Sequence, residues 1–444
     1  MNIKVMLGGL LNLIVRRYLG PFWYRRYWLA KTERLSRVEL DNLQLALLKK
    51  IVRHCYETVP WYKDVMERNS ISLNDLCKIE DIKKFPILTK ADILSAGSSL
   101  VSTKYPKWFL RSAYTGGTTG TPVKLFRSLF SIGNEHAFVR RQWEWAGIGL
   151  LEKCAYLTGR IITNPNEKGS LFAYDPFMKE LVLSTYHLSD ETALSYVGQI
   201  KKHKIMALVG YPSAIYLVAK FCIRNNISLE LKSVMTSSET LTLHMRETIQ
   251  VAFGAKIYDF YGSAERVCYI FTCEKGSYHI NPEYGLTELI PVDDSIACKK
   301  YKVVSTGFWN FAMPFIRYDT GDIVTKSDKN CGCGRKFQVI ESIEGRVSDE
   351  IKTISGRVFG AALLTHLLYG VDNIIESQIV QTQLDFIEIR YVPGNDFGEK
   401  NLNELRALVK LHLPDELAVE YSLVDKIERT VSGKFRPVVS IEGR

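Results

Sequence analysis

The sequence predicts an α/β protein with a large layered N-terminal domain, a strand-rich subdomain and a small α+β C-terminal domain. The chain has 444 residues, which exceeds the size of one ordinary core and makes two or more domains the default. Through its middle, short apolar runs alternate with amphipathic stretches, as in layered sheets with largely parallel strands. After Arg346 the pattern restarts as a compact unit of strands and one helix.

The elements of the layered core are the easiest to place. Strands are predicted at Cys154–Leu157, Ile205–Val209, Ser233–Thr236 and Ile257–Phe260, and helices near 190–202, 213–225 and 242–253. Upstream, residues 39–59 are predicted to form a helix because its apolar residues recur every three or four positions. These are Leu40, Leu43, Leu47 and Ile51.

The remaining elements set the domain boundaries. The region 285–325 is rich in predicted strands, which are Leu286–Ile290, Tyr301–Ser305 and Asp322–Lys326. The C-terminal unit has a strand pair around 375–391, a helix near 401–413 and a strand near 418–424. We therefore expect an N-terminal arm at 1–37, a large domain at 38–345 and a small domain at 346–444.

Positive charge is concentrated in the first 37 residues. The whole chain carries a net charge of +10, and eight Lys or Arg residues against the single Glu33 lie in this arm. Aromatic residues are interleaved with the charges, and the apolar run from Val5 to Val15 is too short for a transmembrane helix. The arm either lies on an anionic membrane surface or docks on the protein itself. No recognised nucleic-acid-binding motif accompanies it, so we expect no nucleic-acid partner.

Composition and cysteine usage indicate the compartment. Hydrophobic residues make up 46% and charged residues 24% of the chain, as is typical of globular proteins. The nine cysteines are scattered and no secretory signal peptide precedes them, which predicts reduced thiols or metal ligands. We expect a cytoplasmic protein that is either free or peripheral on the inner membrane face.

The stretch from Thr115 to Pro122 consists only of Gly, Thr and Pro. Glycines let the backbone approach a phosphate closely, and threonine hydroxyls add donors. The alternative is a flexible surface turn. No Gly-Lys-Ser/Thr follows at the spacing of a P-loop, so that phosphate-binding motif is excluded. The candidate phosphate ligands are Thr115, Gly116, Gly117, Thr118, Thr119 and Gly120.

Four further segments follow in a fixed order. They are Tyr261-Gly262-Ser263-Ala264-Glu265, Arg317-Tyr318-Asp319-Thr320-Gly321-Asp322, Gly345-Arg346-Val347-Ser348-Asp349 and Ser432-Gly433-Lys434. Together with the Thr115–Pro122 stretch, they resemble the adenylate-forming superfamily of acyl-CoA synthetases, peptide-synthetase adenylation domains and luciferases. The finer resemblance is to the phenylacetate–CoA ligase-like branch that includes capsular polysaccharide biosynthesis (CapK-type) proteins. It runs from about Glu39 to the end of the chain.

The resemblance implies an adenylate-forming enzyme fold with a mobile small domain, and a role for each motif residue. Tyr261 would stack on adenine beside Gly262, Glu265 would hold Mg²⁺, and Asp322 would accept from the ribose hydroxyls of ATP. Arg346 would contact ribose or phosphate, Ser348 and Asp349 would form the hinge, and Lys434 would bridge the carboxylate and the ATP phosphates. The catalytic residues implied are therefore Lys434, Glu265 and Arg346.

Two positions depart from the family pattern. Thr121 stands where the family commonly has lysine, so the source of positive charge at the loop is open, with Lys124 as one candidate. Ala264 stands where the family has a hydroxyl that contacts the α-phosphate, so Ser263 or a backbone amide would have to replace it.

A second constellation does not involve ATP. Cys273 and His279 precede Cys331 and Cys333, and these four side chains make up the ligand count of a closed tetrahedral zinc site. The arrangement resembles the zinc site of some phenylacetate–CoA ligase-like enzymes. Cys268 is the reserve ligand, and the alternative is that the four residues are ordinary core or surface positions.

The expected function is ATP-dependent activation of a carboxylic acid as acyl-AMP, followed by acyl transfer. By family position, the acid would bind among Phe130–Trp145, Gly210–Ser213 and Ser237–Glu239. No Lys/Arg cluster in the sequence outside the arm marks a coenzyme A channel between the domains. The resemblance to CapK-type proteins, together with the basic arm, implies as preferred acceptor a sugar-linked amine in surface polysaccharide biosynthesis, with coenzyme A as the alternative. The rival of another class is a non-catalytic, membrane-associated assembly protein.

Overall fold

The computed structural model describes most of the chain. The described residues are 10–11, 13–14, 18, 20–114, 123–150, 152–163, 169–292, 299–346, 351–359, 371, 373–430 and 433–441. Two sets of predicted residues lie outside this part. They are the six candidate phosphate ligands of the glycine-rich stretch, Thr115 to Gly120, and the hinge residues Ser348 and Asp349.

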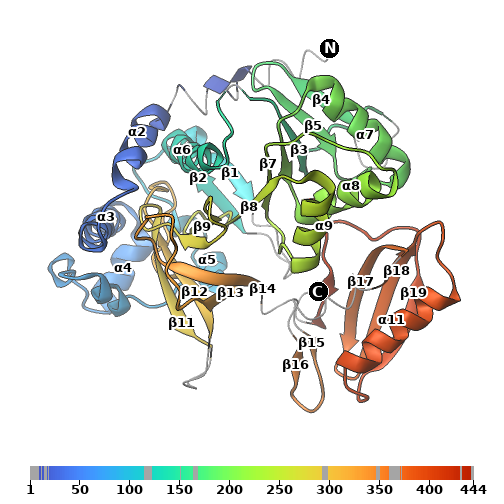
Figure 1. Ribbon diagram of the computed structural model, residues 1–444. Coiled ribbons are helices and arrows are strands. Elements are labelled where there is room, and N and C mark those ends of the chain that lie inside the picture. The colour runs from blue at the N-terminus through green and yellow to red at the C-terminus, as the bar shows by residue number, and fades with distance from the viewer. Residues whose placement is uncertain are drawn as a thin grey trace.

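Helices dominate the N-terminal third, which lies at the left of Figure 1. The α-helices are α2 (Phe22–Thr32), α3 (Arg37–Thr58), α4 (Pro60–Arg68), α5 (Lys90–Ala96) and α6 (Leu129–Trp145). Short 3₁₀ turns connect them at η1 (Leu73–Asp75), η2 (Ile79–Lys84), η3 (Gly97–Leu100) and η4 (Lys107–Phe109). A hairpin of β1 (Arg111–Tyr114) and β2 (Lys124–Arg127) precedes α6.

Helix α3 begins at a capping box, because Glu39 accepts from the Ser36 N–H while the Ser36 hydroxyl accepts from the Glu39 N–H. The predicted helix is confirmed, but its buried face is rotated. Gln44 and Leu48 are buried, whereas Leu43 and Leu47 are only half-buried. The polar Gln44 is tolerated there because its Nε2 donates to the Gly285 carbonyl at 3.2 Å.

One twelve-stranded sheet runs through the large domain, in the order β11-β12-β13-β14-β10-β9-β8-β7-β6-β3-β5-β4. Its mainly parallel half contains β3 (Cys154–Thr158), β4 (Phe172–Asp175), β5 (Glu180–Ser184), β6 (Ala207–Gly210), β7 (Ser233–Ser237) and β8 (Lys256–Gly262). Helices α7 (Asp190–His203), α8 (Pro212–Arg224) and α9 (Leu243–Phe253) pack on this half. The predicted alternation of strands and helices is confirmed.

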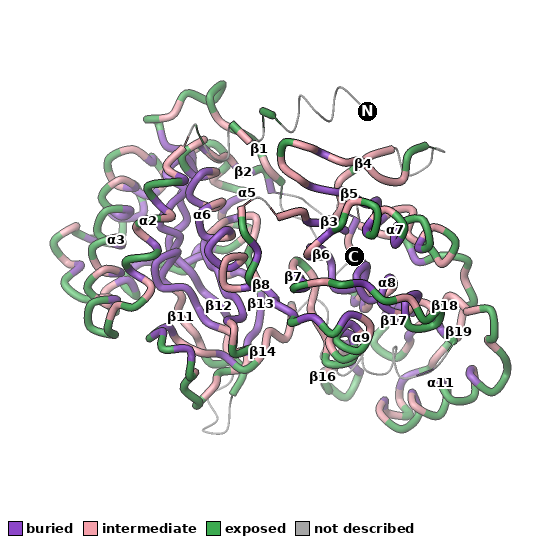
Figure 2. Tube along the Cα trace, turned by 45° about the horizontal axis from the view of Figure 1, so that its top comes forward, coloured by how far each residue is buried: buried purple, intermediate pink, exposed green. Residues whose placement is uncertain are grey.

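The other half of the sheet is antiparallel. It contains β9 (Tyr269–Thr272), β10 (Tyr278–Ile280), β11 (Gly285–Pro291), β12 (Lys300–Gly307), β13 (Tyr318–Lys326) and β14 (Val339–Arg346). Because β9 pairs antiparallel with β8, the predicted strand-rich subdomain continues the sheet of the layered core. In Figure 2 the strands β12 and β13 are largely buried, whereas β11 is only partly buried and the outer turns of α3 are exposed.

The C-terminal domain has its own small core. Its strands are β17 (Ile374–Gln383), β18 (Phe386–Pro393), β19 (Ala418–Leu423) and β20 (Val438–Val439), in the order β19-β18-β17-β20. Helix α11 (Glu399–His412) covers this sheet, and a short hairpin of β15 (Ile351–Lys352) and β16 (Val358–Phe359) lies beside it (Figure 1). The predicted α/β class with a small C-terminal α+β domain is thus confirmed.

Within the described part of the chain, no helix combines the length and the apolar character needed to cross a bilayer.

Candidate active site and metal cluster

The hairpin β1–β2 presents the glycine-rich stretch. Tyr114 and Lys124 are paired across the hairpin, so the glycine-rich stretch falls in sequence between its two strands. The ammonium of Lys124 lies 5.4 Å from the Phe126 ring centroid, on its own strand. The predicted phosphate contacts of the loop stay a prediction, because the loop lies outside the described residues.

Tyr261 and Asp322 meet across the sheet. Tyr261 lies near the end of β8, and its hydroxyl donates to Asp322 Oδ2 at 2.5 Å. Asp322 is buried in β13, opposite the backbone of Arg346 in β14. The structure therefore brings the predicted adenine, ribose and Arg346 positions together, and Gly262 follows directly at the end of β8.

Glu265 lies in the turn that follows β8. Its carboxylate is buried, and Oε1 accepts from the Tyr318 hydroxyl at 3.0 Å. Two residues earlier, the Ser263 hydroxyl is buried without a hydrogen-bond partner among the described residues. A buried hydroxyl without a partner is costly, and a bound phosphate would supply one. Ser263 therefore fits the position left open by Ala264.

Two arginines that the sequence reasoning missed lie beside this turn. Arg127 on β2 is largely buried and donates from Nη2 to the Ala264 carbonyl. Burial and the neighbouring Arg266 lower the pKa of Arg127 to about 10, so it stays charged at neutral pH. Arg266 donates to the Ser131 hydroxyl at 3.0 Å. Arg127 therefore supplies a cation beside the turn that carries Ala264, and only its closeness to the glycine-rich stretch in sequence could have indicated this.

Lys434 lies in a turn of the small domain, and we call its described residues, 429–430 and 433–436, the Lys434 loop. Its turn is closed by the Gly433 N–H donating to the Thr430 carbonyl at 2.7 Å, and by the Lys434 N–H donating to the Thr430 hydroxyl at 3.0 Å. Gly433 has a φ of +75°, and a Cβ there would lie 2.8 Å from the Gly159 Cα of the large domain. Only glycine fits this position without a shift of either domain.

The Lys434 loop contacts the carboxyl ends of the parallel strands. Glu239, just after β7, accepts from the Phe435 N–H at 2.6 Å. Gly159 follows β3, Tyr261 lies at the end of β8, and Glu265 follows β8. Ligands of open α/β sheets bind at this edge of the sheet. The structure thus brings the β8 turn and the Lys434 loop to one edge, although about 170 residues separate Glu265 from Lys434.

The predicted zinc ligands form one cluster. Cys273 follows β9, His279 lies in β10, and Cys331 and Cys333 lie in the loop between β13 and β14. The Sγ atoms of Cys273 and Cys331 are 3.5 Å apart, Cys333 Sγ is 3.5 Å from His279 Nε2, and all four ligand atoms lie within 4.8 Å of one another.

This cluster fits a tetrahedral zinc ion. Ligands about 2.3 Å from one ion at tetrahedral angles lie roughly 3.8 Å apart. Burial lowers the pKa of His279 to about 4, which keeps the imidazole neutral, as a metal ligand must be. The reserve ligand Cys268 lies elsewhere, with its Sγ 3.3 Å from the Thr287 hydroxyl.

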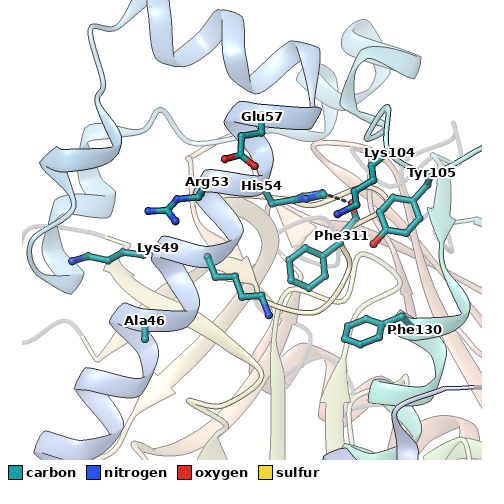
Figure 3. A pocket seen from close by; sticks show the side chains of 10 residues that line it. Ala46, Lys49, Arg53, His54, Glu57, Lys104, Tyr105, Phe130 and Phe311 are labelled. Carbon is teal, nitrogen blue, oxygen red and sulfur yellow. Dashed lines mark hydrogen bonds between the residues drawn. The ribbon is translucent and has the colours of Figure 1, made fainter.

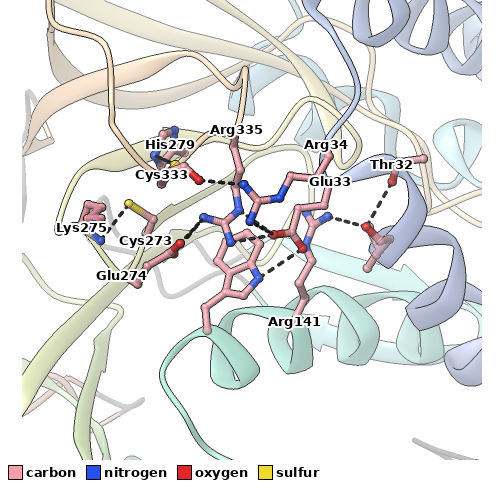
Figure 4. A network of polar contacts seen from close by, with 12 residues as sticks. Thr32, Glu33, Arg34, Arg141, Cys273, Glu274, Lys275, His279, Cys333 and Arg335 are labelled. Atoms are coloured by element: carbon pink, nitrogen blue, oxygen red, sulfur yellow. Dashed lines mark hydrogen bonds and ion pairs between the residues drawn. The ribbon is translucent and has the colours of Figure 1, made fainter.

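A network of ion pairs joins the metal cluster to the N-terminal arm (Figure 4). Arg34 donates from Nη1 to the Cys333 carbonyl at 2.8 Å. Arg335 pairs with Glu33 at 2.6 Å and with Glu274 at 2.8 Å, while its guanidinium lies 3.7 Å from the Trp145 ring centroid. The arm is therefore docked on the large domain through the turn that carries Cys333.

The docked face of α2 buries Phe22, Arg25 and Leu29. Arg25 donates to Asn134 at 2.7 Å and stacks 3.5 Å above the Trp309 ring centroid. Burial lowers the pKa of Arg25 to about 10. Among the two alternatives for residues 1–37, the docked arm is therefore the observed arrangement for α2.

The predicted acyl-binding segments are only partly brought together. Glu239 and Ser213 are in contact, through a Ser213 N–H that donates to Glu239 Oε2 at 3.2 Å. Trp145 instead packs under Arg335, and its indole N–H lies 3.3 Å from Glu33 Oε2, so it belongs to the arm network. Trp143 packs near Tyr156, with ring centroids 6.1 Å apart.

One concavity lies away from these motifs. It has a volume of about 530 Å³ and is lined by α3, by Lys104 and Tyr105, and by Phe130 and Phe311 (Figure 3). Lys49, Lys50, Arg53 and Lys104 make it basic beside the single lining acid Glu57, and only Lys104 is distant in sequence from the other three. It lies beside α3, a helix that is on the opposite side of the large domain from the small domain in Figure 1.

Comparisons with known proteins agree with this architecture. Residues 350–441 match the family model of the CapK C-terminal domain. The protein CapK of Staphylococcus aureus is 26% identical over 435 residues, covering 96% of this chain and 95% of the relative. The phenylacetate-coenzyme A ligase of Thermus thermophilus is 23% identical over 443 residues, covering 92% of this chain and 98% of the relative.

Solved structures show the same fold. A 2-hydroxyisobutyryl-CoA ligase in its postadenylation state superposes with a TM-score of 0.71 at 18% identity, covering 94% of this chain and 92% of that one. The same ligase in its thioesterification state, with CoA bound, gives a TM-score of 0.58 at 19% identity and covers 93% and 91%.

The fold is that of adenylate-forming ligases, and most of the chain is similar to CapK and to phenylacetate-coenzyme A ligases, as its motifs indicated. Within that class, its C-terminal domain is of the CapK type, and the resemblance stated from the sequence is confirmed.

Proposed function

We propose that this protein is an ATP-dependent carboxylate ligase that forms an acyl-AMP and pyrophosphate and then transfers the acyl group. The observation that carries the proposal is the meeting of the β8 turn and the Lys434 loop at the carboxyl edge of the parallel strands. A donor set assembled from both domains suits a reaction whose charge is spread over the phosphates of ATP.

Each residue of the candidate site would have a separate role in the first step. A substrate carboxylate oxygen forms a bond to the α-phosphorus of ATP, and the bond to pyrophosphate breaks. Asp322 would accept from the ribose hydroxyls, and Arg127 and Lys434 would offset phosphate charge. Mg²⁺, held by Glu265, would neutralise further phosphate charge when bound. The buried carboxylate of Glu265 beside the Tyr318 hydroxyl is the oxygen ligand type that this ion prefers.

The acceptor of the second step has two candidates. Coenzyme A is favoured by relatives named as phenylacetate-coenzyme A ligases and by the solved ligase with CoA bound. A sugar-linked amine is the acceptor preferred from the sequence, and the CapK-type C-terminal domain supports it. An amine must be uncharged to attack, so amide formation should accelerate as pH rises toward the pKa of the amine.

The test of the first step is ATP–pyrophosphate exchange with a panel of carboxylic acids. We expect exchange that depends on both the acid and Mg²⁺. Absence of exchange with every acid, together with a lack of ATP binding in calorimetry, would favour the non-catalytic assembly protein instead.

The test of the second step is product mass spectrometry with the cognate acid, ATP and Mg²⁺, with and without coenzyme A. Stoichiometric acyl-CoA identifies a CoA ligase. Acyl transfer to a nucleotide-linked or lipid-linked amino sugar without coenzyme A identifies the sugar-linked amine.

We also propose a structural role for zinc at Cys273, His279, Cys331 and Cys333. The cluster supplies four ligands and leaves no position open, as is typical of structural sites. It ties the loops of the antiparallel half of the sheet together rather than taking part in the reaction.

A further inference from the structure

Glu239 is a carboxylate shared between the two domains. It follows Ser238, whose φ of +72° is unusual for a residue with a side chain and turns the chain sharply at the end of β7. Oε2 accepts from the Ser213 N–H at 3.2 Å, and Oε1 accepts from the Phe435 N–H at 2.6 Å. One side chain thus joins the large domain to the residue that follows Lys434.

The position of Glu239 within the large domain is fixed. Ser213 lies in the first turn of α8, where backbone N–H groups have no partner in the helix and a carboxylate is stabilised by the helix dipole. Glu239 is therefore already held in place before the small domain contacts it. Its second oxygen is left to receive the small domain.

The Lys434 loop is shaped to meet this oxygen. Phe435 is buried, and the guanidinium of Arg429 lies 4.9 Å from its ring centroid. Arg429 itself pairs with Glu376 in β17 of the small domain. Since the Phe435 N–H belongs to the residue directly after Lys434, fixing that N–H fixes where the Lys434 side chain begins.

Further contacts show that the Lys434 loop and the small domain pack against the large domain. Gly433 lies against Gly159 and Tyr186, where a Cβ would come within 2.8 and 2.9 Å of them. Farther away, Lys220 of α8 donates to the Ile374 carbonyl at 2.8 Å. Of these cross-domain contacts, the one at Glu239 is the hydrogen bond adjacent to Lys434.

We propose that Glu239 is a positioning residue that latches the Lys434 loop, and so holds the small domain in the orientation that serves adenylate formation. The inference rests on the proposed function. A substitution at Glu239 should therefore slow the first step, in which Lys434 is needed. It should not slow the second step, in which the small domain has turned away.

Glu239→Gln tests the latch, with Glu247→Gln on the exposed face of α9 as the matched control. The amide of glutamine offers one acceptor atom, so one of the two N–H groups loses its partner. We expect ATP–pyrophosphate exchange to fall about ten- to a hundred-fold, the effect of losing one hydrogen bond to a charged acceptor. Acyl transfer from supplied acyl-AMP should stay within about twofold, because the Phe435 contact is not used in that step. Equal loss in both steps would overturn the proposal.

A second variant, Gly433→Ala, changes the latch on the side of the small domain. Gly433→Ala places a Cβ against Gly159 and should give the same split between the two steps. Combining Glu239→Gln with Lys434→Ala should be no worse than Lys434→Ala alone, because both act on one interaction. Additive losses would contradict a latch that works through Lys434.

Amide hydrogen exchange tests the latch without any activity. In the wild type the Phe435 amide should be protected, and in Glu239→Gln its protection should drop while that of α11 stays unchanged. Unchanged protection of Phe435 would overturn the latch. If instead no acid supports exchange of pyrophosphate but Phe435 loses protection, the latch stands and the proposed function fails.

Discussion

At the scale of single residues, the site is built from partners that lie far apart in the sequence. Tyr261 reaches Asp322, Arg127 reaches Ala264, and Glu239 reaches Phe435. Each polar group is buried or half-buried, so each contact matters more than it would in water. Lys434 differs from these residues because its expected task exists in only one orientation of the small domain.

Lys434→Ala should therefore separate the two steps of the reaction. We expect adenylate formation to fall about a hundred-fold or more, as when one preorganised donor of a transition state is removed. Transfer from supplied acyl-AMP should be spared. The matched control is Lys426→Ala, since Lys426 is exposed in the same domain. Equal loss in both steps would show that the small domain does not alternate as proposed.

At the scale of elements, the metal-binding turn and α2 form one unit. Arg34 and Arg335 connect the loop of Cys333 to Glu33 at the end of the arm. Gly334 has a φ of +84°, and a Cβ there would lie 2.7 Å from the Arg34 guanidinium. Zinc bound as proposed would keep this close approach in register, so loss of zinc should also loosen the arm.

The purified protein should carry about one zinc per chain. Cys331→Ser with Cys333→Ser should abolish the zinc measured by elemental analysis and raise amide exchange across residues 22–34. Cys77→Ser is the control, because Cys77 is exposed and outside the cluster. Zinc retained by the double variant, or none in carefully prepared wild-type protein, would contradict the site. Zinc loss without any change in the arm would show that the two are independent.

At the scale of the whole molecule, helix α2 of the arm has one buried face and one exposed face. Its inner face buries Phe22, Arg25 and Leu29, while Trp23, Tyr24 and Tyr27 are exposed, Tyr24 to 68% and Tyr27 to 61%. Aromatic rings beside basic residues suit the surface of an anionic membrane. Membrane binding therefore stays a prediction for the outer face of α2, even though its inner face is docked.

Vesicle sedimentation tests this prediction. Binding to phosphatidylglycerol vesicles should be salt-sensitive, because each Lys or Arg near such a surface contributes about 1 kcal/mol. Tyr24→Ser with Tyr27→Ser should weaken it, whereas Leu411→Ser, at an exposed apolar residue of α11, should not. These variants keep the buried face of α2, which a truncation at Val38 would remove. Equal binding to neutral phosphatidylcholine vesicles would argue against the membrane role.

Much of the fold could be predicted because its signals are local. The strands around Val209 and Met235 and the helix 190–203 follow from periodicity within short windows. The rotated face of α3 could not be predicted, because Gln44 is buried only through its hydrogen bond to Gly285, 241 residues away. The four metal ligands were predicted from residue type and spacing, and the fold brings them within reach of one ion.

The sequence by itself determined the α/β class, the small C-terminal domain and the ordered motifs, since each depends on residues close together in the chain. Only the tertiary structure decided which residues complete the site. Arg127 at the turn of Ala264, Glu239 beneath the Phe435 N–H and Arg335 against Glu33 are each contacts across more than a hundred residues. No local pattern marks such residues, because their roles arise from the sheet order and from the docking of one domain or helix on another.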